Sequence, residues 1–117
     1  MGYNSDFNGS YHPSKKIPLE VVERINGMDL DLKVALPTQS FYDEGDIVPW
    51  SSEMHGYNFA EDLVKIVNIL KPLGIKLSGE VYRTGEESGD YELIEARGGR
   101  VYTRSGRVVY GKRKEVK

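Results

Sequence analysis

The sequence predicts an α+β fold, in which a mostly antiparallel sheet of five or six strands has two helices packed on one face. Three observations support this prediction: short segments of alternating apolar and polar residues, two segments with apolar residues at helical spacing, and glycine-containing turns between the last strands. The chain of 117 residues suits a single domain. We expect that domain to span residues 1–111, with a basic tail at residues 112–117.

The first third of the chain predicts a strand, a helix and a second strand. Aromatic residues alternate with polar ones over residues 3–11, which indicates a strand with a bulge near Gly9. Residues 17–26 have the pattern of a short helix, and Gly27 suits the left-handed position that often follows a helix. Leucine and valine alternate with charged residues over residues 30–36, which indicates a half-buried strand.

The middle of the chain predicts an irregular segment and the longer helix. Residues 37–57 carry little periodicity apart from a possible short strand at 46–50. Asn58 is placed to cap the following helix, with Glu61 three residues later as in a capping box. Pro72 and Gly74 are expected to stop this helix.

The last third predicts an antiparallel meander. Gly98-Gly99 and Ser105-Gly106 are both two-residue turn signals, so we expect strands at 91–97, 100–104 and 107–110. The first turn places Ala96 opposite Val101, and the second turn continues the same apolar face.

Charge is unevenly distributed along the chain. Residues 1–96 carry eight Lys/Arg and seventeen Asp/Glu, whereas residues 97–117 carry eight Lys/Arg and a single acid, Glu115. Because there is no cysteine, disulfides, thiolate nucleophiles and cysteine zinc sites are excluded. The sequence contains no apolar run of membrane-helix length and no secretory signal, so we expect a cytoplasmic protein.

Short motifs resemble a family of small, uncharacterised proteins of bacteriophages and bacterial mobile elements. They are the opening Met1-Gly2-Tyr3 with Gly9, and Gly79-Glu80-Val81 followed by Gly85-Glu86-Glu87-Ser88-Gly89-Asp90. The resemblance covers roughly residues 1–103 and implies no catalytic residues. It implies a setting in which small acidic proteins often block host defence complexes, such as CRISPR systems, in the bacterial cell.

Two acidic segments are candidates for binding a protein partner. Carboxylates next to aromatic residues can oppose a basic surface and supply interface anchors. The candidate residues are Glu86, Glu87 and Asp90 in one turn, and Asp43, Glu44, Asp46, Trp50 and Tyr57 in the irregular loop. The alternatives are that the acids solvate a polar turn and that the aromatic residues cover an edge of the core.

The basic end of the chain is a candidate for binding nucleic acid. Arginines interleaved with tyrosines on a β-ribbon suit phosphate contacts and base stacking. The candidate residues are Arg97, Arg100, Tyr102, Arg104, Arg107, Lys112, Arg113 and Lys114. The alternative is an ordinary amphipathic hairpin whose arginines pair with Glu80, Glu92 and Glu95 across the sheet.

These features predict a binding protein rather than an enzyme. His12 and His55 are far apart in sequence with no recognisable partners, and no catalytic, metal or cofactor motif is present. The first hypothesis is therefore a phage-type protein that inhibits a host protein complex by mimicking nucleic-acid charge. The second is a nucleic-acid-binding module that uses the basic ribbon. The third is a small-molecule binder that sequesters a nucleotide in a dimer cleft.

Overall fold

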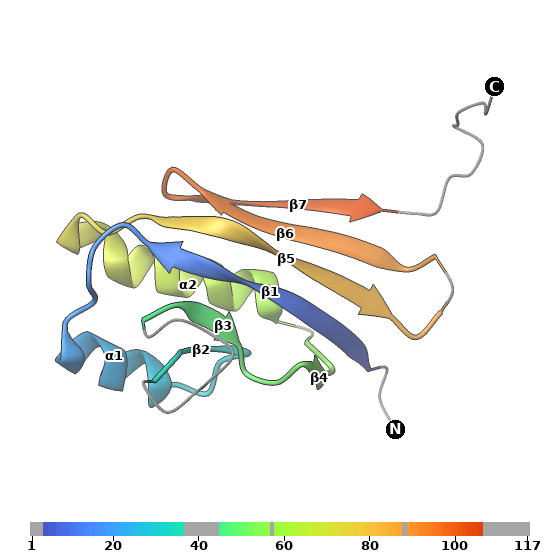
Figure 1. The fold of residues 1–117 in the computed structure, drawn as a ribbon, viewed down its shortest axis with the longest axis horizontal. Helices are drawn as coiled ribbons and strands as arrows, with labels where there is room; N and C mark the ends of the chain where they lie inside the picture. Colours follow the sequence, from blue (N-terminus) through green and yellow to red (C-terminus); the bar gives the residue numbers. More distant parts are fainter. Residues whose placement is uncertain (1–3, 37–44, 57, 88, 107–117) are drawn as a thin grey trace.

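The computed structural model describes residues 4–36, 45–56, 58–87 and 89–106, and it confirms the α+β fold (Figure 1). Its elements are β1 (Ser5–Pro13), α1 (Leu19–Asn26), β2 (Leu32–Val34), β3 (Ile47–Pro49), β4 (Glu53–Met54), α2 (Phe59–Leu70), η1 (Lys71–Leu73), β5 (Leu77–Gly85), β6 (Tyr91–Arg97) and β7 (Arg100–Gly106). The sheet has seven strands rather than five or six, because the two-residue β4 is too short to leave a pattern in the sequence. None of the helices in these four ranges is long and apolar enough to span a bilayer.

The strands form one antiparallel sheet with β1 near its centre. The order is β2-β3-β1-β5-β6-β7, and β4 also pairs with β1. β1 pairs with β5 along its whole length, from Ser5 opposite Gly85 to Pro13 opposite Leu77. On its other side, β1 pairs with β3 near one end and with β4 near the other.

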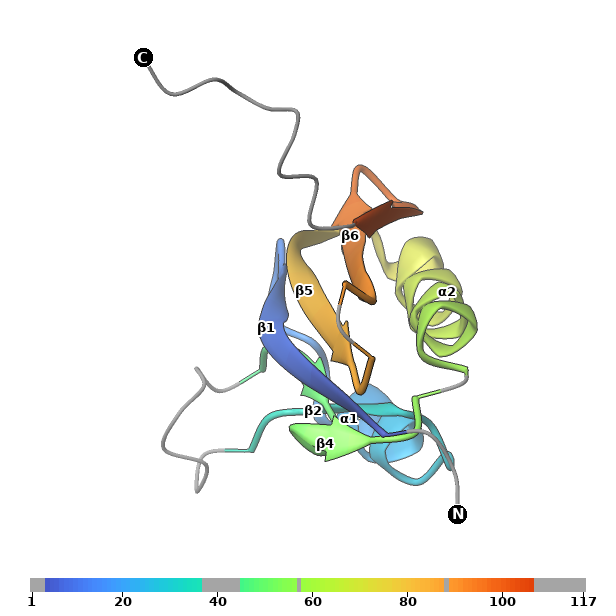
Figure 2. The same cartoon turned by 90° about the vertical axis from the view of Figure 1, so that its right-hand side faces the viewer.

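The core lies between one face of the sheet and the two helices. From β1, Phe7 and Tyr11 are fully buried, and the Tyr11 hydroxyl donates a hydrogen bond of 2.8 Å to the carbonyl of Ile94. The Phe7 ring stacks on Phe59, the first residue of α2, with 4.8 Å between ring centroids. Figure 2 shows α2 against this face of β5 and β6, and neither described helix lies on their opposite face.

Two glycines let β1 and β5 approach closely. Gly9 and Gly79 both face the core side and have φ angles of 130° and 137°. A Cβ at Gly9 would collide with the backbone of Glu80, and a Cβ at Gly79 would collide with the backbone of Ser10. The pairing between the two strands is continuous, so the bulge predicted near Gly9 is wrong. Glycine at this position allows the two backbones to approach closely and does not mark an extra residue.

The helix boundaries are close to those predicted, but their caps differ. Gly27 follows α1 with φ −85°, a right-handed conformation, so the predicted left-handed position is wrong. The side chain of Asn58 makes no capping hydrogen bond, and its backbone N–H instead donates to Oδ2 of Asp31 at 3.2 Å. α2 ends at Leu70, before Pro72, and the short η1 that follows it ends at Gly74, which has φ 72°.

The hairpin around Gly98-Gly99 has the predicted register. Ala96 lies opposite Val101, and Arg97 lies opposite Arg100. The predicted turn at residues 105–106 is wrong, because β7 continues through both and Gly106 pairs with Tyr91 of β6. The inter-strand pairing extends the strand past the local turn signal. The strand predicted at 107–110 and the tail at 112–117 lie outside the described residues.

Candidate functional site

The uncovered face of β5, β6 and β7 gathers tyrosine and arginine side chains from three strands. The register puts Tyr82, Leu93 and Arg104 in one row across this face, and Glu80, Glu95 and Tyr102 in the next. Side chains alternate along a strand, so these residues face away from Val81 and Ile94, which are buried in the core. We call these six residues together with Arg97 and Arg100 the outer face.

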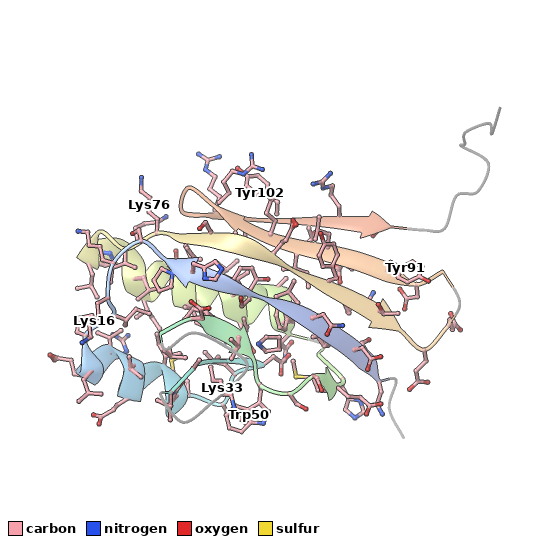
Figure 3. The ribbon with its side chains drawn as sticks, in the orientation of Figure 1. Lys16, Lys33, Trp50, Lys76, Tyr91 and Tyr102 are labelled. Carbon is pink, nitrogen blue, oxygen red and sulfur yellow. The ribbon has the colours of Figure 1, made fainter. Side chains whose placement is uncertain are left out.

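The aromatic residues of the outer face are accessible to a ligand. Tyr82 is 53% exposed and Tyr102 is 46% exposed, although both lie in the middle of strands. Figure 3 shows Tyr102 on the side of the sheet away from the helices. Tyrosines in such positions offer ring surface for stacking without further rearrangement of the backbone.

The two carboxylates of the outer face are both engaged within the face. Glu80 accepts a hydrogen bond of 2.8 Å from the Tyr82 hydroxyl, and this bond raises the pKa of Tyr82. Glu95 pairs with Arg97 at 2.8 Å and lies 4.0 Å from Arg104. Glu80 and Glu95 lie directly opposite one another, an unfavourable pairing for like charges that these hydrogen-bond partners offset.

Three arginines of β6 and β7 lie on the outer face, with Arg97 and Arg100 next to the Gly98-Gly99 turn and Arg104 two rows away, opposite Leu93. Arg97 and Arg104 are mostly exposed despite their contacts with Glu95. Arg100 is also exposed and has no ion pair with any other described residue. Four predicted nucleic-acid residues therefore share one face: Arg97, Arg100, Tyr102 and Arg104. The other four, Arg107, Lys112, Arg113 and Lys114, lie outside the described residues.

Tyr82 and Leu93 belong to the outer face but were not among the predicted site residues. The signal for Tyr82 is the alternation in β5: if Val81 faces the core, its neighbour must face outward. Among the described residues, Glu95 is the one predicted partner that pairs with arginines of the outer face. Glu80 bonds to Tyr82, and Glu92 lies on the core side of β6, where it pairs with Arg83.

Arg83 forms a half-buried ion-pair cluster on the core side. Its guanidinium contacts Asp90 at 2.9 Å, Glu92 at 3.0 Å and the hydroxyl of Ser5 at 3.0 Å. The hydrogen bonds to Asp90 raise the pKa of Arg83 further above its ordinary value. Asp90, predicted to bind a partner, is thus an internal ion-pair residue that closes the β5–β6 turn.

The remaining residues predicted to bind a partner do not form one surface. Glu86 and Glu87 are exposed in the β5–β6 turn, where Glu86 accepts a hydrogen bond of 2.6 Å from the backbone of Asn4. Trp50 is 56% exposed and lies beneath the ammonium of Lys33, at 5.1 Å from its ring centroid (Figure 3). Asp46 is buried, and Asp43, Glu44 and Tyr57 lie outside the described residues.

Asp46 instead pairs with a histidine. Its Oδ1 lies 2.9 Å from Nδ1 of His12, a partner 34 residues away that sequence spacing does not indicate. The two residues line a cavity of about 790 Å³ between α1 and the ends of β1 and β2. Its described lining is largely apolar, with Lys15 and Lys16 as its cations, and no hydroxyl or thiol contributes to it.

The described residues contain no group of three or more His, Asp and Glu side chains arranged to hold a metal ion. Comparison with protein-family models, curated proteins and solved structures finds no match to this chain. The resemblance to phage and mobile-element proteins therefore stays a prediction.

Proposed function

We propose that this protein is a non-enzymatic nucleic-acid-binding protein whose outer face holds a single strand. The observation that carries the proposal is the placement of Tyr82 and Tyr102 in adjacent rows of a helix-free sheet face, with arginines beside both. Exposed sheet aromatics are a recurring platform for splayed bases, since every base has a π-face to stack. The resemblance to phage and mobile-element proteins supports the bacterial cytoplasm as its compartment.

The charges of the outer face fit the same ligand. Arg100, which has no ion pair with another described residue, and Arg104, which is largely exposed beside Glu95, can reach phosphates at the edge of the face, whereas Glu80 and Glu95 are held by neighbouring side chains. Negative charge elsewhere on the domain opposes a polyanion, but salt screens that repulsion beyond about 8 Å at physiological ionic strength. A single strand fits better than a duplex, because stacking on flat rings requires unpaired bases.

The experiment is a fluorescence-anisotropy titration with labelled single-stranded DNA, single-stranded RNA and duplex DNA over a salt series. We expect binding of single strands that weakens with salt. Tyr82→Leu and Tyr102→Leu should each weaken it by about tenfold, because stacking contributes roughly 1–3 kcal/mol per base. Tyr102→Phe keeps the ring and should bind nearly as well as the wild type.

Val64→Ala is a matched control, because Val64 is an exposed apolar residue on α2, away from the outer face. Wild-type protein that binds no oligonucleotide even at low salt contradicts the proposal. So does equal loss of binding in the Tyr102→Leu and Tyr102→Phe variants.

A second candidate function is inhibition of a host protein complex. It is favoured by an acidic cluster at the end of the sheet where β1 begins. Asp6 of β1 lies directly opposite Glu53 of β4, and Glu86 is tied to Asn4 just before β1. No described Lys or Arg forms an ion pair with these three carboxylates. Uncompensated like charges are a feature of surfaces that meet a basic partner.

Pull-down from the bacterial host tests this candidate, with Glu53→Lys and Glu86→Lys as a double charge reversal. Asp90 is left intact because its loss would also disturb Arg83. Capture of the same partner by the doubly reversed protein would exclude an acidic-mimic mechanism. Loss of capture, with oligonucleotide binding unchanged, would support it.

A further inference from the structure

A small cavity at the basic end of the molecule is lined by cations and glycines. It has a volume of about 300 Å³ and lies between η1, the start of β5 and the β6–β7 turn. Its lining residues are Val67, Lys71, Gly74, Ile75, Lys76, Gly98, Gly99 and Arg100. None of these described residues is a carboxylate, and the three charged ones are all positive.

The cations reach this cavity from three separate elements. Lys71 belongs to η1, Lys76 immediately precedes β5, and Arg100 begins β7. None of the three forms an ion pair with another described residue. A fourth cation is close, since a Cβ built on Gly74 would lie 3.2 Å from Nζ of Lys15. Unpaired like charges brought together by the fold are unfavourable unless an anion binds between them.

Three glycines form part of the cavity wall with backbone alone. Gly74, Gly98 and Gly99 all have positive φ, and a Cβ on Gly99 would lie 4.0 Å from Cε of Lys71. The tip of the β6–β7 turn thus faces the stem of Lys71 across a gap with no side chain in it. Glycine backbone allows a phosphate group to approach closely.

One feature opposes an anion here, namely the negative end of the α2 dipole. The carbonyl groups nearest the cavity are already engaged, however. Val67 O accepts from the N–H of Lys71, Leu70 O from Ile75, and Lys71 O from Gly74. Helix polarity explains a lysine at position 71 but not Lys76 or Arg100 on the neighbouring strands.

We propose that this cavity binds a terminal phosphate monoester of the strand held on the outer face. The inference rests on the proposed function for the rest of the ligand. Arg100 connects the two sites, because it lines the cavity and also lies in the row of the outer face next to Tyr102. A phosphate monoester carries more charge than an internal diester, so a pocket of three cations favours the end of a strand.

The test compares one short oligothymidine in three forms: 5′-phosphorylated, 3′-phosphorylated and without a terminal phosphate. We expect one phosphorylated form to bind about fivefold more tightly at low salt, the effect of favourable ion pairs near a surface. Lys71→Ser with Lys76→Ser should abolish that preference and leave binding of the unphosphorylated strand nearly unchanged. Lys65→Ser is the matched control, since Lys65 is an exposed lysine on α2 outside the cavity.

A second measurement does not depend on oligonucleotide binding. Inorganic phosphate should raise the thermal unfolding temperature of the wild type above that in chloride at equal ionic strength, and this rise should vanish in the double lysine variant. Equal affinity for all three oligonucleotides, together with no phosphate-specific stabilisation, would overturn the phosphate pocket and leave the outer face intact as a binding surface. Phosphate stabilisation without oligonucleotide binding would support the pocket and reject the proposed function.

Discussion

Gly9 and Gly79 are the residues whose replacement should most disturb the sheet. Each lies where the paired backbones of β1 and β5 approach closely. Each has a positive φ, and a Cβ added to it would collide with a backbone carbonyl of the other strand. Gly89 also has a positive φ, of 86°, but a Cβ there meets nothing within 4 Å. These positions therefore separate the cost of backbone strain from the cost of a steric clash.

We predict that Gly9→Ala lowers the free energy of unfolding by more than about 2 kcal/mol, because strain and overpacking add. Gly89→Ala should cost about 1 kcal/mol, the strain alone. Urea unfolding followed by circular dichroism measures both. An equal loss of unfolding free energy in the two variants would show that the backbones of β1 and β5 are not as close at Gly9 as described.

Among the elements, α2 is tied to the segment before β2 through two aspartates. Asp62 is buried in α2 and accepts a hydrogen bond of 2.9 Å from the backbone N–H of Asp31. The carboxylate of Asp31 in turn accepts from the N–H of Asn58, just before the helix. Burial raises the pKa of Asp31, the hydrogen bond from Asn58 opposes this rise, and the nearby charges of Asp62 and Asp29 add to it, so that the net shift is upward.

The raised pKa gives a pH dependence with a defined sign. Since the folded protein holds the proton on Asp31 more tightly than the unfolded chain, this residue makes stability fall as pH rises above its ordinary pKa of 3.8. Asp31→Asn should therefore be more stable than the wild type at neutral pH, and the difference should disappear below pH 3.8. Its amide oxygen still accepts from Asn58.

Urea unfolding of the wild type and of Asp31→Asn, at neutral pH and below pH 3.8, checks this prediction. Glu23→Gln is the control, because Glu23 is an exposed carboxylate on α1 and is not among the charges that raise the pKa of Asp31. An Asp31→Asn protein that is less stable than the wild type at neutral pH would mean that the carboxylate serves α2 as a favourable cap.

Local patterns predicted most elements, and pairing between strands decided the rest. The Gly98-Gly99 turn defines its own register because both flanking strands adjoin it in sequence. Ser105-Gly106 carries the same signal but lies within β7, since pairing with residues 91 and 92 extends the strand through it. The close approach of the two backbones at Gly9 depends on β5, which comes about seventy residues later, so no local pattern encodes it.

Across the described part of the molecule, opposite charges lie at the two ends of the sheet, although this separation does not follow the division of charge along the sequence, because Lys71 and Lys76 belong to the acidic first part of the chain. One end carries Asp6, Glu53 and Glu86, and the other carries Lys71, Lys76 and Arg100. The outer face lies between them with its tyrosines. This arrangement would orient a bound strand with its phosphates toward the basic end.

The fold as a whole decides which of the predicted site residues lie on one surface. The basic candidates shared two adjacent strands, so their common face followed from alternation. The acidic candidates came from distant segments, and the fold uses Asp46 and Asp90 for internal contacts with His12 and Arg83. Sequence spacing carries no information about such contacts.

The central claim, that the outer face is the ligand surface, is tested most directly by NMR. Unlabelled oligothymidine is titrated into ¹⁵N-labelled full-length protein, and shifts of backbone amides and of the Trp50 indole N–H are followed. We predict that the largest changes fall on β5, β6 and β7 around Tyr82, Leu93 and Tyr102, while the Trp50 indole stays unchanged. Changes centred on Glu53 and Glu86, or on α1, would contradict the claim, as would a spectrum that does not change at all.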